Sequence, residues 1–141
     1  MRDNRFSYTT RVIDPGDVLY LRLSGIDTPA MSRETASKIA REVHCGRFRG
    51  LVADYRPVRF LHNETQFDHL SGKFAHILPE GLVMACVYGR PQKAHAIMMV
   101  RSLQASGMLA GAFRDHHDAL SWIRDTLTFR DASATALKKS A

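Results

Sequence analysis

The chain has 141 residues, and 20 lysines and arginines against 14 aspartates and glutamates give it a formal net charge of +6. The hydrophobic fraction of 45% is that of an ordinary globular domain, and no apolar run approaches the roughly 20 residues that span a bilayer. This length favours one domain with its own core, and the composition predicts no stable membrane insertion.

A basic balance favours either nucleic acid or an acidic partner. The arginines are scattered, however, and the densest group, Arg47, Arg49, Arg56 and Arg59, has Asp54 inside it. No basic stripe interleaved with aromatic residues is present. The sequence therefore predicts no binding to nucleic acid.

The first residues predict a β-hairpin. Residues Tyr8 to Ile13 carry β-branched side chains, and Asp14–Asp17, which read DPGD, are typical of a turn. The next stretch, VLYLRLSG from Val18, alternates leucines with other side chains, which indicates a strand with one apolar face.

The rest of the chain predicts helices and strands in alternation. Thr28-Pro29 offers an N-cap and a proline at the first helical position, and Gly46 ends that helix. Beyond it the expected segments are strand 51–55, a helix from 63 to 78, strand 82–88, a helix that GRPQ opens at 89 and Gly107 closes, strand 108–113 and a helix from Asp115 to Leu127.

This order predicts an α/β fold with a mixed, mostly parallel sheet. We expect about five strands, with the N-terminal β-hairpin followed by βαβαβ units, and four helices over the sheet. Residues 1–127 would form a single domain. Residues 128–141 end in small and polar side chains, DASATALKKSA, and we expect a flexible C-terminal tail there.

Four stretches resemble a known family. VLYLRLSGID, LVADYRPV, LVMACVYG and GMLAGAFRDHHDALSWI are similar to the strands and the last helix of the SpoIIAA-like (STAS/SEC14-like) family of small bacterial proteins. The element order also resembles the STAS fold of anti-sigma-factor antagonists. The resemblance covers residues Tyr8 to Leu127 and implies that fold. It carries no catalytic motif, because these stretches are patterns of a fold.

The resemblance also implies where a regulatory switch would lie. In the antagonists, a serine pair follows the third strand at the start of a helix, and a partner kinase phosphorylates one of them. Here Asp54, Val58 and Phe60 keep the surrounding pattern, but Asn63 and Glu64 stand where the serines would be. A serine-phosphorylation switch therefore does not carry over to this chain.

The candidate partner-binding surface lies at two junctions between a strand and a helix. Its residues are Arg56, Arg59, His62, Asn63, Glu64 and Thr65 at the first junction and Arg90 at the second. Both junctions are expected at one edge of the sheet, where an acidic patch of a partner could be recognised. A capping box of Asn63 and Gln66 would explain the helix start without any partner.

An apolar cavity is the alternative candidate site. Relatives of the SEC14-like kind hold apolar ligands between helices and sheet, and such a cavity could be lined here by Phe67, Phe74, Met84 and Met99. The same residue types at this spacing also serve as ordinary core.

Catalytic and metal sites are not supported by the residue pattern. His62, His69 and His76 would stand roughly 10 Å apart along a helix, too far for one metal, so we expect a partly exposed histidine edge. His116, His117 and Asp118 diverge around a first helical turn and also form a poor metal site.

The two cysteines offer no nucleophile. Cys45 lies at the end of a helix, where the negative end of the helix dipole would raise the pKa of its thiol. Cys86 lies inside an apolar strand and is expected to act as a small hydrophobic residue. The pair makes no disulfide framework and fits a reduced compartment.

The sequence therefore predicts a non-enzymatic STAS-like domain that needs no cofactor or metal. We expect it to act by binding another, unidentified protein, with a regulatory role. The alternative function is a small module that binds an apolar ligand or lipid. The N-terminal residues MRDNRFSYTT lack the apolar stretch of a signal peptide, so a cytoplasmic location is expected.

Overall fold

The computed structural model describes residues 4–140, with side chains up to residue 138. In this part of the chain the strands are β1 (Ser7–Ile13), β2 (Val18–Asp27), β3 (Gly50–Asp54), β4 (Val58–Phe60), β5 (Val83–Val87) and β6 (Leu109–Phe113). The helices are α1 (Pro29–Gly46), α2 (Glu64–Ile77), α3 (Lys93–Ala105) and α4 (His116–Ser140), with a short 3₁₀ helix, η1 (Arg90–Gln92), before α3.

The sheet has the strand order β1-β2-β3-β5-β6, and only β1 runs antiparallel to its neighbour. The predicted mixed, mostly parallel sheet with a hairpin at its start is confirmed. The strand β4 was not expected. It arises because β2 continues past its last pair with β3, at Arg22, so that Gly25–Asp27 pair with Val58–Phe60 instead.

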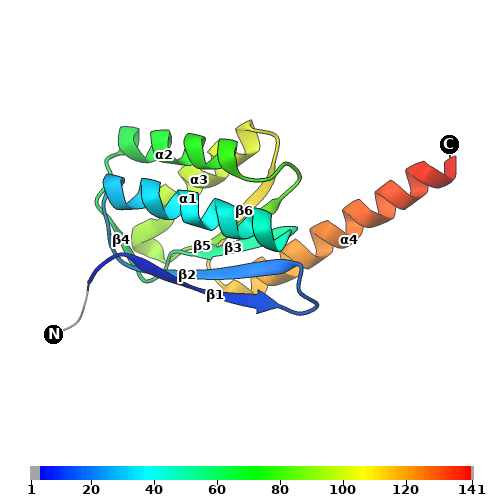
Figure 1. Cartoon of the computed structure of the whole chain (residues 1–141), viewed down its shortest axis with the longest axis horizontal. Helices are drawn as coiled ribbons and strands as arrows, with labels where there is room; N and C mark the ends of the chain where they lie inside the picture. Colours follow the sequence, from blue (N-terminus) through cyan, green and yellow to red (C-terminus); the bar gives the residue numbers. More distant parts are fainter. Residues whose placement is uncertain (1–3, 141) are drawn as a thin grey trace.

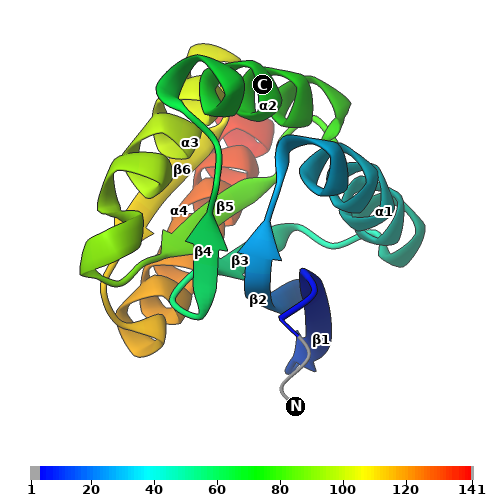
Figure 2. The ribbon, with the colours of Figure 1, turned by 90° about the vertical axis from the view of Figure 1, so that its left-hand side faces the viewer.

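The helices cover the two faces of the sheet unequally. Helices α1, α2 and α3 lie together on one face, whereas α4 packs on the other, against β3, β5 and β6 (Figures 1 and 2). Strands β3 and β5 are buried along their whole length, as their continuous apolar sequences predict. Two apolar cores result, one on each face, and Ile123 of α4 is fully buried in the smaller one.

The helix boundaries follow the sequence signals at most positions. The Thr28 side chain accepts a hydrogen bond from the Met31 N–H at 3.3 Å, and Pro29 occupies the first turn of α1. The helix α1 ends at Gly46 as predicted, but the residue with left-handed backbone is Arg47, with φ of 53°. At the start of α4, the Asp115 side chain accepts from the His117 N–H at 2.8 Å.

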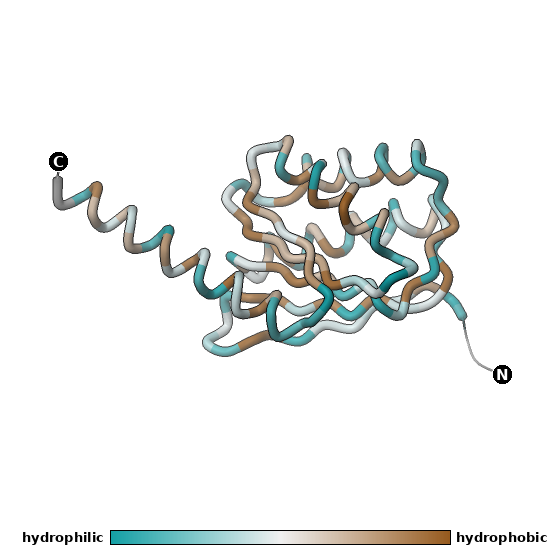
Figure 3. The backbone as a smooth tube through the Cα atoms, turned by 180° about the vertical axis from the view of Figure 1, so that it is seen from behind, coloured by the Kyte–Doolittle hydropathy of each residue, from teal (hydrophilic) through white to brown (hydrophobic). Residues whose placement is uncertain are grey.

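The expected end of the last helix at Leu127 is wrong, because α4 continues through Ser140. Residues 128–140 contain no glycine or proline, and their alanines favour helix, so nothing in them stops the α4 backbone. This part of α4 projects beyond the sheet (Figures 1 and 3). Phe129 and Leu137 are 74% and 73% exposed there. The flexibility of this segment stays a prediction.

Candidate functional site

Several helix starts meet at one end of the sheet. Strands β2, β3 and β5 run parallel, so their carboxyl ends lie at the same edge, and α1, α2 and η1 begin beside it. Figure 2 faces this end of the molecule, with the tips of β2 and β4 below the first turns of α1 and α2. The two junctions that the sequence singles out are therefore neighbours. The Tyr55 N–H, after β3, donates to the Val87 carbonyl oxygen at 2.7 Å.

The start of α2 is a capping box, as predicted. The Asn63 side-chain oxygen accepts from the Gln66 N–H at 2.8 Å, and the Gln66 side-chain oxygen accepts from the Asn63 N–H at 2.9 Å. Glu64 and Thr65 follow in the first turn and are exposed. The cap therefore fixes the start of α2, and the polar side chains of Glu64 and Thr65 are accessible to solvent.

Two of the residues that lead into this helix, Arg59 and Leu61, are also exposed. Arg59 of β4 is exposed to solvent, and Leu61, between β4 and α2, is 50% exposed. We name Arg59, Leu61, Asn63, Glu64 and Thr65 the helix-start surface. η1 packs against β4, and the Gln92 side chain donates to the Val58 carbonyl oxygen at 2.8 Å.

Arg90 is exposed at the beginning of η1. Because η1 packs on β4, Arg90 lies on the same end of the molecule as the helix-start surface. Arg59 and Arg90, two arginines of the predicted partner-binding surface, are thus exposed at this end.

His62 does not belong to the exposed surface, and the predicted exposed histidine edge is wrong at this position. His62 is only 7% exposed, and its Nε2 lies 2.9 Å from the Ser32 hydroxyl oxygen. The Ser32 hydroxyl in turn donates to the Asp27 carboxylate at 2.6 Å. The reason is that β4 pairs with the end of β2 and draws the residues after it over α1. His62 is a buried link between α1 and α2.

This buried cluster is not arranged as a catalytic triad. When Asp27 is ionised, the one proton of Ser32 goes to Asp27, so His62 is the donor in its contact with the Ser32 oxygen. Neutral His62 then carries its proton on Nε2 and cannot take one from Ser32. The remaining ring nitrogen, Nδ1, has no hydrogen-bond partner among the residues that the structure describes. In a hydrolase the carboxylate would orient the histidine, whereas here it holds the serine.

The environment of Asp27 disfavours its charge. The side chain is 2% exposed, one carboxylate oxygen has no hydrogen-bond partner, and burial raises the pKa of Asp27 to about 6 despite the Ser32 hydrogen bond. Burial, and then the nearby His95, lower the pKa of His62. Both groups therefore favour their neutral forms in the folded chain more than they would in water.

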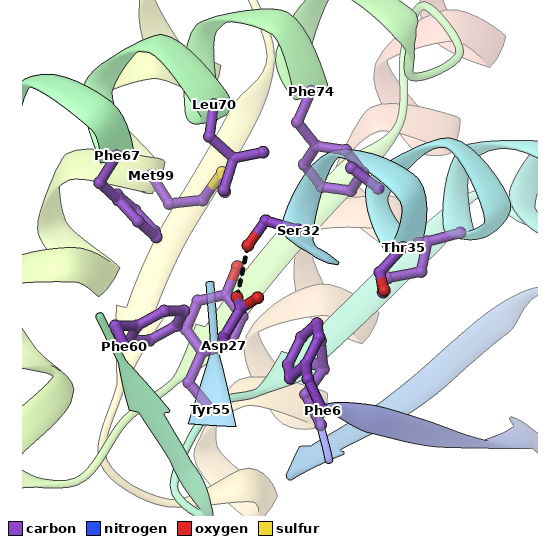
Figure 4. Close-up of a pocket in the computed structure, with 13 residues that line it drawn as sticks. Phe6, Asp27, Ser32, Thr35, Tyr55, Phe60, Phe67, Leu70, Phe74 and Met99 are labelled. Atoms are coloured by element: carbon purple, nitrogen blue, oxygen red, sulfur yellow. Dashed lines mark hydrogen bonds between the residues drawn. The ribbon is translucent and has the colours of Figure 1, made fainter. Parts of the chain in front are cut away.

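A cavity adjoins this cluster and receives three of the four predicted ligand-cavity residues. Phe67, Phe74 and Met99 line it together with aromatic side chains of other elements, and Asp27 and Ser32 lie at its wall (Figure 4). Met84 is fully buried in the core but does not line the cavity. The cavity has a volume of about 40 Å³. Sites for drug-sized ligands run to about 300–1,000 Å³, so this space is of the order that ordered water fills.

Arg56 turns away from the helix-start surface. Its guanidinium donates to both oxygens of Asp54, at 2.9 and 2.7 Å, and its backbone N–H donates to the same carboxylate at 3.1 Å. Asp54 is fully buried. Burial alone would raise the pKa of Asp54, but the hydrogen bonds from Arg56 and Tyr20 outweigh it and lower that pKa. Arg56 therefore neutralises a buried charge and is not a free contact residue.

Two other sequence observations can be placed. Cys86 is fully buried and burial raises the pKa of its thiol to about 12, as expected for a hydrophobic role, while Cys45 is exposed. The structure brings one ligand atom each of Asp115, His116 and His117 within 4.8 Å of one another. The sequence analysis considered Asp118 instead of Asp115, which is the N-cap of α4.

Asp27, Ser32 and Leu61 were not predicted as site residues from the sequence. A signal for Ser32 was present, since it shares the helical face of Ala36, Ile39 and Val43 and therefore points into the core. Asp27 ends a strand and reads as a loop residue. Leu61 follows Phe60, so the two residues read as adjacent apolar positions of the core. The pairing of β4 with β2 leaves the Leu61 side chain exposed.

The comparisons with solved structures give two neighbours of the same architecture. An anti-sigma factor antagonist from Mycobacterium paratuberculosis matches with a TM-score of 0.55 at 20% identity, over 84% of this chain and 95% of that chain. The anti-sigma factor antagonist SpoIIAA in its unphosphorylated form matches with a TM-score of 0.54 at 12% identity, over 84% and 98%. No family model and no curated protein matches the sequence. The chain therefore has the SpoIIAA-like STAS fold of the anti-sigma factor antagonists.

Proposed function

We propose that this chain is a non-enzymatic domain that binds another protein, and that the partner docks on the helix-start surface. The observation that carries the proposal is the exposure of Leu61, at 50%, between the exposed polar residues Arg59 and Asn63. An apolar side chain inside a polar rim on a rigid support has the anatomy of a small interface centre. The solved neighbours, by their names, act on another protein, an anti-sigma factor.

The charges support an acidic partner. The chain has a net charge of +6, and Arg59 and Arg90 lie exposed on the end of the molecule that carries Leu61. Positive charge around an apolar contact steers an acidic protein surface and raises its association rate. Glu64 is the exception, and it gives the helix start a permanent negative charge. In this proposal the surface works without serine phosphorylation, because Asn63 and Glu64 replace the serine pair.

The arrangement of Ser32, His62 and Asp27 supports a role other than catalysis, because His62 donates its proton toward Ser32. The cavity of about 40 Å³ gives no support to a lipid ligand. Among residues 4–140, no helix combines the length and the apolarity that crossing a membrane demands. We place the encounter with the partner in the cytoplasm.

Native mass spectrometry of the chain gently purified from its own cells tests the proposal. A second polypeptide in stoichiometric amount is expected, and its acidic surface should make the complex weaken as salt rises. A chain that carries only a small molecule, or one that turns over a substrate, would contradict the proposal.

A further inference from the structure

A polar groove lies on the face of the sheet that α4 covers in part. α4 packs mainly on β3, β5 and β6, which leaves the outer part of this face, on β1 and β2, without a helix. The groove there has a volume of about 290 Å³. Its lining residues all carry hydrogen-bond donors, and they are Thr9, Thr10, Arg11, Tyr20, Arg22, Arg56 and His116.

Tyr20 organises this groove. The Arg11 guanidinium lies 5.5 Å from the centre of the Tyr20 ring, and the His116 ring meets the same ring edge-on, with centroids 6.2 Å apart. The Tyr20 hydroxyl donates to the Asp54 carboxylate at 2.6 Å. Burial and then this hydrogen bond raise the pKa of Tyr20 to about 12, so its hydroxyl keeps its proton. Tyr20 thereby fixes side chains from β1, β3 and α4 around one centre.

The charges in the groove are not balanced. Arg56 and Arg22 share one oxygen of Asp54, at 2.7 and 3.9 Å, and Asp54 itself is fully buried beneath them. Within the described residues, neither the Arg11 nor the Arg22 guanidinium donates a hydrogen bond to another protein group. Three guanidiniums therefore line the groove, and two of them contact the one buried carboxylate of Asp54, which leaves an excess of two positive charges among these four groups and most of the donors of Arg11 and Arg22 available.

We propose that this groove binds the dianionic phosphoryl group of a small molecule. A phosphate monoester carries about −1.5 to −2 charges at pH 7, which matches the excess of two positive charges, and its three oxygens suit the planar donor forks of arginine. The Thr9 side chain, on the same face of the sheet as its partner Arg22, offers a further hydroxyl donor. This site is separate from the helix-start surface and does not depend on the proposed function.

Pyrophosphate is the probe for the test, added to the full chain at low ionic strength and followed by isothermal titration calorimetry. We expect one site, and we expect Arg11→Ala and Arg22→Ala each to weaken it by about tenfold or more. Arg41→Ala, at an exposed position of α1 on the other face of the sheet, removes the same charge and is the matched control. Arg56 is left intact because it neutralises Asp54.

Three results would overturn the proposal. The first is equal weakening by Arg41→Ala, which would mean attraction by net charge and an adventitious ion only. The second is binding of malonate, a dicarboxylate with two negative charges, as strongly as pyrophosphate, since the arginine side chains would then not select phosphate. The third is the absence of any heat of binding up to about 10 mM pyrophosphate, well beyond the range of a specific ligand.

Discussion

The Leu61 backbone N–H donates a hydrogen bond to the Asp27 carbonyl oxygen at 2.9 Å. The Asp27 carboxylate also accepts a hydrogen bond from the Ser32 hydroxyl. The same hydroxyl oxygen contacts His62, the residue that follows Leu61. The exposed leucine of the helix-start surface is thus anchored to a buried polar cluster by both backbone and side chains. This connection gives the helix-start surface a fixed shape. Substitutions in the buried cluster leave the residues of that surface unchanged, so the cluster can be tested by itself.

Ser32→Ala should destabilise the fold. It removes the one hydroxyl that contacts Asp27 and His62, and it leaves a buried carboxylate with no side-chain partner. We expect the free energy of unfolding to fall by about 1–3 kcal/mol in urea denaturation. Ser37→Ala, at an exposed position of the same helix, is the control and should change it by less than about 0.5 kcal/mol. Equal effects of the two variants would show that the buried cluster contributes nothing.

Asp27 should make stability depend on pH between its two pKa values. Burial raises the pKa of Asp27 to about 6, from an ordinary 3.8. In this window the folded chain holds a proton that the unfolded chain has released. The free energy of unfolding contributed by Asp27 is therefore full below about pH 4 and is lost as the pH rises to about 6.

Asp27→Asn removes this titration and isolates it. The stability of the wild type minus that of the variant should fall by on the order of 2 kcal/mol from pH 4 to pH 7, measured by urea denaturation at each pH. The lowered pKa of His62 acts in the opposite direction, since it reduces stability as the pH falls, but it is present in both proteins and largely cancels in the difference. A difference that stays flat with pH would contradict the raised pKa.

Arg56→Ala should be far more damaging than Arg59→Ala. The first variant leaves Asp54 fully buried without its bidentate partner, which costs about 3–5 kcal/mol in comparable buried pairs. Arg59 is exposed on β4, so its removal should change the free energy of unfolding by less than about 0.5 kcal/mol. Thermal denaturation of the two variants in parallel would reveal the difference. A stable Arg56→Ala protein would mean that Asp54 takes up a proton at little cost.

Deletion of residues 133–141 should leave the fold intact. Leu137 is 73% exposed, whereas the earlier part of α4 is tied to the domain by the ion pair of Arg49 with Asp131 and by the Arg130 contact to the Gly81 carbonyl oxygen. We expect a change in the free energy of unfolding below about 0.5 kcal/mol, with a smaller helical signal in circular dichroism. A marked loss of stability would show that the end of α4 packs on the domain.

The fold could be predicted because its signals are local. Pro29 and Gly46 mark the ends of α1, Asn63 and Gln66 form the expected cap of α2, and the buried strands β3 and β5 read as continuous apolar runs. The end of α4 could not be predicted in this way. It depends on the absence of a stop signal after Leu127, and small polar residues are compatible with both a tail and a helix.

The site was harder to predict because it depends on pairing between distant residues. His62 looked like an exposed residue until β4 paired with β2 and brought it against Ser32. Arg56 looked free because its partner Asp54, two positions earlier, also reads as part of a buried strand. The exposed residues Asn63, Glu64 and Thr65 could be named because the capping pattern fixes them locally.

Docking of a partner protein around Leu61 can be tested by comparing two leucine substitutions. The wild-type chain, Leu61→Asp and Leu137→Asp are each used to capture the partner, and the affinity of the isolated partner for each is measured. Leu61 is 50% exposed on the helix-start surface and Leu137 is 73% exposed at the far end of α4, so the same substitution is made at two exposed leucines. We predict that Leu61→Asp weakens binding by about tenfold or more, as expected for the centre of an interface, while Leu137→Asp leaves it unchanged. Unchanged binding to a folded Leu61→Asp chain would contradict the account.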